Sequence, residues 1–149
     1  MSHGQAIGRD GLGLVLFSGG YDRVHYALAM AAAAAASGRR VSLLVTGRAL
    51  PALLPGAGPD AAGWHGLDAA DDGSSPRERD RSFEDRGVAT FEELLTSCGA
   101  LGITVIVCEM GLRALNLAAD TRLRDDVPAT LGGIVGFLGT VGGGSLLFI

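Results

Sequence analysis

One of the two cysteines of this chain, Cys108, lies where a functional thiol is expected. It follows the apolar, β-branched run Ile103–Val107, whose composition and length are typical of a strand buried in a parallel sheet. In open parallel sheets, reactive groups lie just past the carboxyl ends of the strands. A thiolate there is a nucleophile, and the backbone N–H groups of a following helix would lower its pKa. Cys108 is therefore the candidate catalytic residue.

The residues after Cys108 give conflicting signals about its charge. Glu109 places a carboxylate beside the sulfur, and a nearby negative charge disfavours the thiolate. Arg113 would compensate for that charge if the chain folds back over the strand end. A buried structural thiol is the alternative interpretation, because cysteine is among the most buried residue types.

The other cysteine, Cys98, is predicted to be a small buried side chain. Together with Phe91, Leu94 and Leu95 it forms the i, i+3, i+4, i+7 stripe of an amphipathic helix. The strand between the two cysteines is about 3.3 Å per residue, which separates them by roughly 16 Å. A disulfide requires Cα atoms within about 7 Å, so no intrachain bridge to Cys108 is predicted.

A glycine turn, Ser18-Gly19-Gly20, links the first apolar run to a helix that begins at Tyr21. Backbone N–H groups at such a turn can hold an anion, although the spacing matches neither a dinucleotide-binding fingerprint nor a phosphate-binding loop. An ordinary tight turn is the alternative. If the first strand neighbours the Cys108 strand, the turn and the thiol line one crevice. His25, one helical turn after Tyr21, is then available as a proton carrier, the alternative being a solvated histidine without a role.

The remaining motifs do not match a known reactive pattern. His3 and His65 lack the neighbouring ligands that a metal site requires, and no metal or other cofactor is predicted. All 12 basic residues are arginine, which excludes mechanisms built on a Schiff-base or phosphate-loop lysine. The alternating charges of Arg77–Arg86 indicate a solvated, ion-paired segment.

Composition indicates an acidic, apolar protein that assembles with itself. A chain of 149 residues with a net charge of −4 predicts one domain and no nucleic-acid partner. A mean hydropathy of +0.33 leaves apolar surface beyond the core, so a homo-oligomer is expected. The cysteine usage and the lack of a signal-peptide pattern in Met1–Gly11 indicate the cytoplasm. Leu131–Ile149 is uncharged, but its seven glycines disfavour a membrane-spanning helix.

Short apolar runs alternate with helical patterns along most of the chain. The expected strands are Leu12–Phe17, Val41–Val45, Ile103–Cys108 and Ser145–Ile149. The expected helices are Tyr21–Ser37, Ala49–Leu54, Phe91–Ala100, Leu112–Ala119 and Ala129–Val141. This alternation predicts a single α/β domain over residues 1–149, with a parallel sheet of about four or five strands. The polar stretch Pro55–Arg86 is predicted to be a long loop or insertion.

Five motifs occur in a particular order along this chain. They are Ser18–Ala27 before an alanine-rich helix, Val45-Thr46, Gly87–Leu95, Val107–Leu112 and Gly132–Val135. This order resembles the DsrE/DsrF-like family of small sulfur-relay proteins, over most of the chain outside the insertion. The resemblance implies a flavodoxin-like three-layer fold with helices on both faces of the sheet. It also implies homo-oligomers, often trimers or hexamers.

The resemblance assigns a role to Cys108, because family members with a cysteine at the end of this strand carry a persulfide on it. The predicted function is therefore a cytoplasmic sulfur-relay protein, a persulfide carrier or sulfurtransferase, with a sulfur donor or acceptor protein as partner. Neither a membrane nor a nucleic acid is an expected partner. The predicted pocket residues are Ser18, Gly19, Gly20, Tyr21, His25, Glu109, Met110, Gly111 and Arg113.

Sulfur relay has two alternatives. The main alternative is a non-enzymatic oligomeric module that binds a small anion or a nucleotide, with Cys108 merely lining the crevice. A thiol peroxidase is disfavoured, because the chain has neither a CxxC pair nor the Thr/Pro-flanked cysteine usual in such enzymes.

Overall fold

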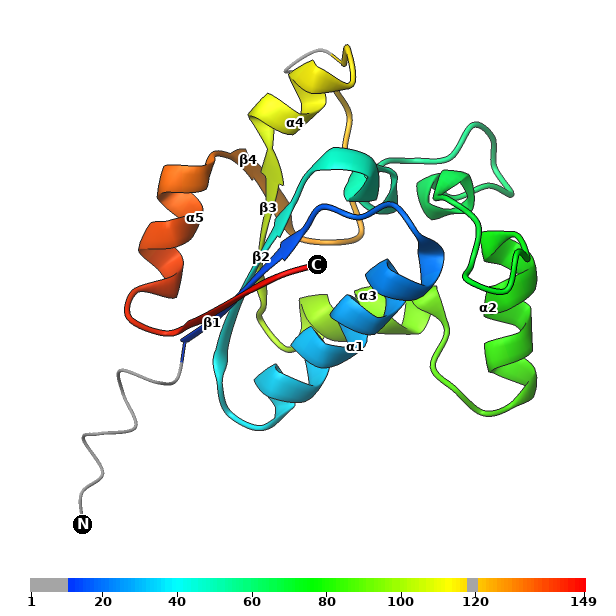
Figure 1. Cartoon of the computed structure of the whole chain (residues 1–149), viewed down its shortest axis with the longest axis horizontal. Coiled ribbons are helices and arrows are strands. Elements are labelled where there is room, and N and C mark those ends of the chain that lie inside the picture. Colours follow the sequence, from blue (N-terminus) through cyan, green and yellow to red (C-terminus); the bar gives the residue numbers. More distant parts are fainter. Residues whose placement is uncertain (1–10, 118–120) are drawn as a thin grey trace.

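A computed structural model of the chain describes residues 11–117 and 121–149. All strands of its sheet are parallel, in the order β4-β3-β2-β1-β5. They are β1 (Gly11–Leu16), β2 (Arg40–Val45), β3 (Thr104–Cys108), β4 (Ala129–Gly132) and β5 (Ser145–Phe148). Helices α1 (Tyr21–Ala36) and α3 (Phe91–Ala100) lie on one side of the sheet and α5 (Ile134–Val141) on the other (Figure 1). This three-layer, flavodoxin-like α/β architecture confirms the predicted fold class.

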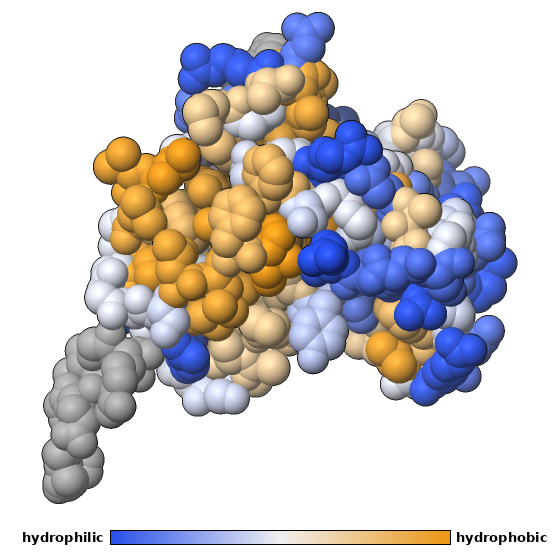
Figure 2. Space-filling view, viewed as in Figure 1, coloured by the Kyte–Doolittle hydropathy of each residue, from blue (hydrophilic) through white to orange (hydrophobic). Residues whose placement is uncertain are grey.

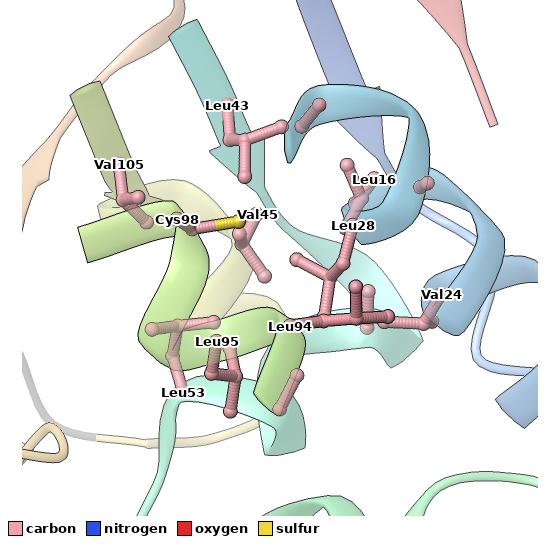
Figure 3. Close-up of a cluster of buried hydrophobic side chains, with 14 of the residues drawn as sticks. Leu16, Val24, Leu28, Leu43, Val45, Leu53, Leu94, Leu95, Cys98 and Val105 are labelled. Atoms are coloured by element: carbon pink, nitrogen blue, oxygen red, sulfur yellow. The ribbon is translucent and has the colours of Figure 1, made fainter. Parts of the chain in front are cut away.

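Alternation along the strands divides the interior into two clusters. Leu43 and Val45 of β2 point toward α1 and α3, where they join the larger cluster. Leu44, between them, points to the opposite face and joins a small cluster under α5. Figure 3 shows part of the larger cluster, in which the sulfur of Cys98 lies beside Val45. Both cysteines are free and buried, and they lie in different clusters, which confirms that they form no intrachain disulfide.

The order of the strands corrects one prediction. The strand β2 lies between β1 and β3, so the first strand is not the neighbour of the Cys108 strand. In the common flavodoxin-like order, 2-1-3-4-5, those two strands are adjacent. Here β2 and β3 follow β1 on the same side, and only β5 is added on the other side of β1. The crevice expected between Ser18–Asp22 and Cys108 is therefore absent from its predicted place.

The predicted helix over Ala129–Val141 is wrong in its first half. Residues Ala129–Gly132 form β4, which pairs with Val105–Cys108, and α5 begins only at Ile134. Gly132 ends the strand and Gly133 separates it from the helix, and glycine favours such a break over continued helix. A second turn at Gly142–Gly144 separates α5 from β5, as the sequence predicted. In the described part of the chain, no helix has both the length and the apolar character needed to cross a bilayer.

The polar insertion is more regular than its composition predicts. It contains the 3₁₀ turn η3 (Gly63–Gly66) and a ten-residue helix, α2 (Pro76–Asp85). Ser75 caps α2 by accepting a hydrogen bond from the Glu78 N–H, with Pro76 as the first helical residue.

Two further helices differ from their predicted bounds, and α3 matches its predicted bounds. The turn after β2 is the 3₁₀ helix η2 (Gly47–Leu53). The helix after Cys108 is α4 (Glu109–Ala114), which begins three residues earlier than predicted and is shorter. The helix α3 has its predicted bounds, and Thr90 and Glu93 form a capping box at its start.

Candidate functional site

Cys108 is the last residue of β3 and the N-cap of α4, at the carboxyl edge of the sheet. In the sheet register it pairs with Gly132 at the end of β4. Its side chain belongs to the small cluster under α5, formed with Leu44, Ile106, Phe137 and Val141. The thiol therefore lies at the end of a strand, as the sequence predicts, but it is closed off from solvent because only 1% of the residue is exposed.

The helix that covers Cys108 is held by few side chains. Of the eight residues of α5, only Phe137 and Val141 are buried. Glycines flank the helix at both ends, and Gly142 has a φ of +60°, a conformation that favours glycine. A short element with few buried contacts opens locally at a low free energy. The cover over the thiol is therefore the thinner of the two helical layers.

The predicted pocket residues on α4 lie at the same edge as Cys108 but face in different directions. Gly111 is buried and packs so closely on η2 that a Cβ would lie 2.4 Å from Thr46 Oγ1. Met110 is 60% exposed, Arg113 is exposed and Glu109 is half-buried. Gly111 thus positions α4 against the loop after β2.

The glycine turn after β1 is closed by the insertion. Asp68 donates its backbone N–H to the Gly19 carbonyl at 2.8 Å and accepts the Tyr21 N–H on its own carbonyl at 3.2 Å. The Ser18 N–H bonds the Ile149 carbonyl at 3.1 Å. Gly20 forms a parallel bridge with Asp68. Two of the N–H groups of this turn, those of Ser18 and Tyr21, therefore bond to carbonyls of the protein itself.

Tyr21 and His25 lie together, but on the face of the sheet opposite Cys108. Tyr21 is fully buried and donates its hydroxyl to Asp80 at 2.5 Å. Burial, and then the Asp80 carboxylate, raise the Tyr21 pKa well above its usual value. The Nε2 of His25 bonds the Ala89 carbonyl at 2.8 Å, so this nitrogen carries a proton and donates. The two rings belong to an aromatic group with centroid distances of 4.6 to 6.0 Å, completed by Trp64, Phe83 and Phe91.

Sequence reasoning missed a cavity of about 520 Å³ between the insertion and the segment before β4. Its wall is built on Arg124, whose guanidinium bonds Glu92 at 2.7 and 2.8 Å and Asp126 at 2.6 and 2.9 Å. The indole N–H of Trp64 donates to Glu92 at 2.6 Å. These partners, Arg124 first, hold the Glu92 pKa below its usual range. The sequence contains one sign of this cavity, Trp64, which the polar composition of the insertion identifies as a hydrophobic anchor.

His65 lies between this cavity and a smaller one of about 190 Å³. Its Nδ1 accepts the Ala62 N–H at 3.1 Å, so the neutral ring carries its proton on Nε2. Partial burial, and then Arg77, lower the His65 pKa. Four carboxylates and two guanidiniums line the larger cavity, and this balance does not favour an anion.

The structure thus brings only some of the predicted site residues together. Cys108 lies with the α4 residues at one edge, and Ser18–Tyr21 and His25 lie under the insertion across β2. Cys108 lines neither of the two cavities. Within residues 11–117 and 121–149, no group of histidine, cysteine and acidic side chains is arranged to hold a metal, and His3 falls outside those residues.

Comparison with protein-family models found no match to this chain, and comparison with curated proteins found none either.

Proposed function

We propose that this protein is a sulfur carrier of the DsrE/DsrF-like type, with Cys108 as the residue that holds the sulfane sulfur. One observation carries the proposal: a lone thiol ends the strand β3 at the carboxyl edge, under a helix held by two buried side chains. The other described cysteine, Cys98, lies deep in the larger cluster, where burial raises its pKa to about 11. Cys108 is thus the better placed of the two for transfer.

The transfer begins when Cys108 loses its proton and its sulfur becomes a thiolate. The thiolate attacks the terminal sulfur of a donor persulfide, R–S–SH. A bond forms between Cys108 Sγ and that sulfur, and the donor S–S bond breaks. The donor leaves as the thiolate R–S⁻, and Cys108 becomes a persulfide without any external oxidant. An acceptor thiolate removes the sulfur by the same exchange.

Because only 1% of Cys108 is exposed, this chemistry requires the cover to open. The glycine-containing turns at both ends of α5 supply the pivots for such an opening. Burial between transfers would protect the persulfide from other thiols. In this proposal the protein works in the cytoplasm as a homo-oligomer of three or six copies, and donor and acceptor are proteins.

Intact mass measured after incubation with a small-molecule persulfide, without denaturant, tests the proposal. The wild type and Cys98→Ala should each gain the mass of one sulfur atom, and Cys108→Ala should gain none. The matched pair of alanine variants controls for the loss of a buried thiol. Absence of the adduct in the wild type, or its persistence in Cys108→Ala, would reject the role of Cys108.

A second candidate function, non-covalent binding, is favoured by the 520 Å³ cavity. Its excess of carboxylates and its Trp64 and His65 rings suit an organic cation better than the anion or nucleotide of the sequence-based alternative. Thermal unfolding in the presence of putrescine, inorganic phosphate or ATP distinguishes these ligands. Stabilisation by putrescine alone supports the cavity as the functional site. Stabilisation by phosphate or ATP supports the anion-binding alternative.

A further inference from the structure

One side of the molecule exposes a continuous apolar surface that its own helices leave uncovered. We name it the α5–β5 face and define it by Phe17, Ile134, Val135, Leu138, Leu146 and Phe148, which are 46 to 86% exposed. Figure 2 shows the orange surface extending from α5 onto the neighbouring strands. The rings of Phe17 and Phe148 lie 5.5 Å apart and link β5 to the end of β1.

The face exists because one helix is too narrow for the sheet. Five strands about 4.8 Å apart span roughly 19 Å between the outer strand axes, whereas a helix with its side chains is about 10 Å wide. Two helices, α1 and α3, share the opposite side. On this side α5 packs on β1 and β2, and Leu146 and Phe148 of β5 remain half or more exposed. Sheet surface is therefore left bare beside α5, and on the β5 side it presents Leu146 and Phe148.

The chemistry of the α5–β5 face is that of an interface rather than of a solvated surface. The whole segment Leu131–Ile149 lacks a charged residue, and charged residues are depleted in interface cores. The strand β5 is an edge strand without the charges or prolines that usually protect an edge. Six side chains of this size, 46 to 86% exposed, present several hundred Å², approaching the ~800 Å² that each partner of a standard interface buries.

Two glycines within α5 point to close approach by another element. Gly136 and Gly139 lie inside the helix, where each destabilises it by about 1 kcal/mol relative to alanine. A Cβ added at either position would meet nothing within 4 Å, so packing within the chain does not require them. Glycines on the outer side of a helix allow a neighbouring backbone to come near.

We infer that a second copy of this chain packs on the α5–β5 face, with the α5 of each copy filling the bare surface of the other. The face contains both halves of such a contact: the outer side of α5 (Ile134, Val135, Leu138) and the bare surface beside it (Phe17, Leu146, Phe148). A surface with both halves is self-complementary about a two-fold axis. The inference rests on the six-copy form of the homo-oligomer in the proposed function, because a ring of three copies has no two-fold axis. It does not rest on the chemistry of Cys108.

Sedimentation velocity tests the inference on the wild type, Val135→Arg and Phe148→Asp. Val135 is 86% and Phe148 is 71% exposed, so neither charge enters the core. Val88→Arg is the matched control, because Val88 is 43% exposed and precedes α3, on the opposite side of the sheet. The wild type and the control should sediment as a multiple of the 15.1 kDa chain. Each charged variant of the face should weaken association by about tenfold or more.

The inference is overturned if the wild type is a monomer, or if either face variant associates as the wild type does. It is also overturned if Val88→Arg dissociates the assembly equally. Sulfur uptake by Cys108 is read separately, from the intact mass of the wild type. A monomer that still gains sulfur would reject the proposed interface but not the sulfur-carrier role of Cys108. An oligomer that gains no sulfur would reject the sulfur-carrier role but not the interface.

Discussion

The two faces of the sheet differ in how deeply they are covered. On one face, α1, α3 and the insertion build a core that includes an aromatic group and a network of ion pairs. On the other, α5 closes a cluster of five buried residues and leaves large apolar side chains in solvent. Each face holds one cysteine, Cys98 in the deep core and Cys108 under the thin cover. The deeper core is thus on one face, and the other face has the thinner cover over its cysteine and the larger exposed apolar surface.

Matched deletions of one phenylalanine on each face should give the largest effects. Phe91 is fully buried and stacks on Trp64 with a centroid distance of 4.9 Å. Phe91→Ala should lower the free energy of unfolding by about 4 to 5 kcal/mol, because the surrounding rings cannot collapse into the cavity. Phe137→Ala should cost about 3 kcal/mol, since its smaller cluster lies near solvent. Urea denaturation followed by circular dichroism, at several protein concentrations, measures both.

Equal losses from the two deletions would contradict the comparison between the faces. Leu101→Ala serves as control, because Leu101 is 41% exposed and lies in neither cluster. It should change the stability by less than about 0.5 kcal/mol.

Outside the insertion, local patterns were sufficient to predict the strands and helices that build the face covered by α1 and α3. The apolar runs gave β1, β2 and β3, and the apolar stripe that begins at Phe91 gave α3. The helix α2 had a usable signal in Ser75-Pro76 followed by Glu78, but its charge run suggested a loop. Its position depends on distant partners, such as the pairing of Arg79 with Asp22, and these are invisible in a local window.

The face covered by α5 could not be predicted from local patterns. The four residues of β4 carry no strong strand signal, and none of them is buried, so their pairing with β3 decides their conformation. The place of Cys108 at a strand end followed from the apolar run before it. Its burial depends on α5, which connects strands at opposite edges of the sheet. Its separation from Ser18 depends on the strand order, which no local pattern encodes.

Thiol labelling should sharpen the comparison at the two cysteines themselves. Cys108, measured in Cys98→Ala, should react with iodoacetamide at least about tenfold faster under native conditions than Cys98, measured in Cys108→Ala. Opening of α5 would expose the thiol of Cys108, whereas exposure of the Cys98 thiol requires the larger core cluster to unfold. Burial also raises the Cys98 pKa to about 11, so little of it is thiolate near neutral pH. Peptide mass spectrometry over time measures both rates, and equal rates would show that α5 is no weaker a cover than α3.

The ion pairs on the face covered by α1 and α3 should contribute a smaller part of the free energy of unfolding, and this part should depend on pH. Glu92→Gln should lower the free energy of unfolding at neutral pH by about 1 to 2 kcal/mol, because an amide N–H₂ would face the guanidinium donors of Arg124. Arg124 holds the pKa of Glu92 below its usual value, so the carboxylate stabilises the native state above its unfolded pKa. That contribution is lost as the pH falls through the lower native value.

Urea titrations of the wild type and Glu92→Gln between neutral pH and about pH 3 measure this dependence. The difference between the two proteins should shrink as the pH falls. Glu84→Gln is the control, because it removes an exposed carboxylate from α2 and should change neither the stability nor its pH dependence. A constant difference across the range would show that the Glu92 charge is not what holds the cavity wall.

The smallest expected loss of stability comes from a substitution that tests how the insertion is attached to the face covered by α1 and α3. The hydroxyl of Tyr21 donates to Asp80 on α2, and Asp80 also accepts the Phe91 N–H at 2.8 Å. Tyr21→Phe should lower the free energy of unfolding by about 1 kcal/mol, and Tyr26→Phe, a change at a 66% exposed ring, should have no effect. The native environment raises the Tyr21 pKa, so this residue stabilises the wild type fully below its unfolded pKa and less as the pH rises beyond it. The deficit of Tyr21→Phe should therefore narrow in alkali, and a deficit that is absent at neutral pH would mean that packing alone attaches α2 to the core.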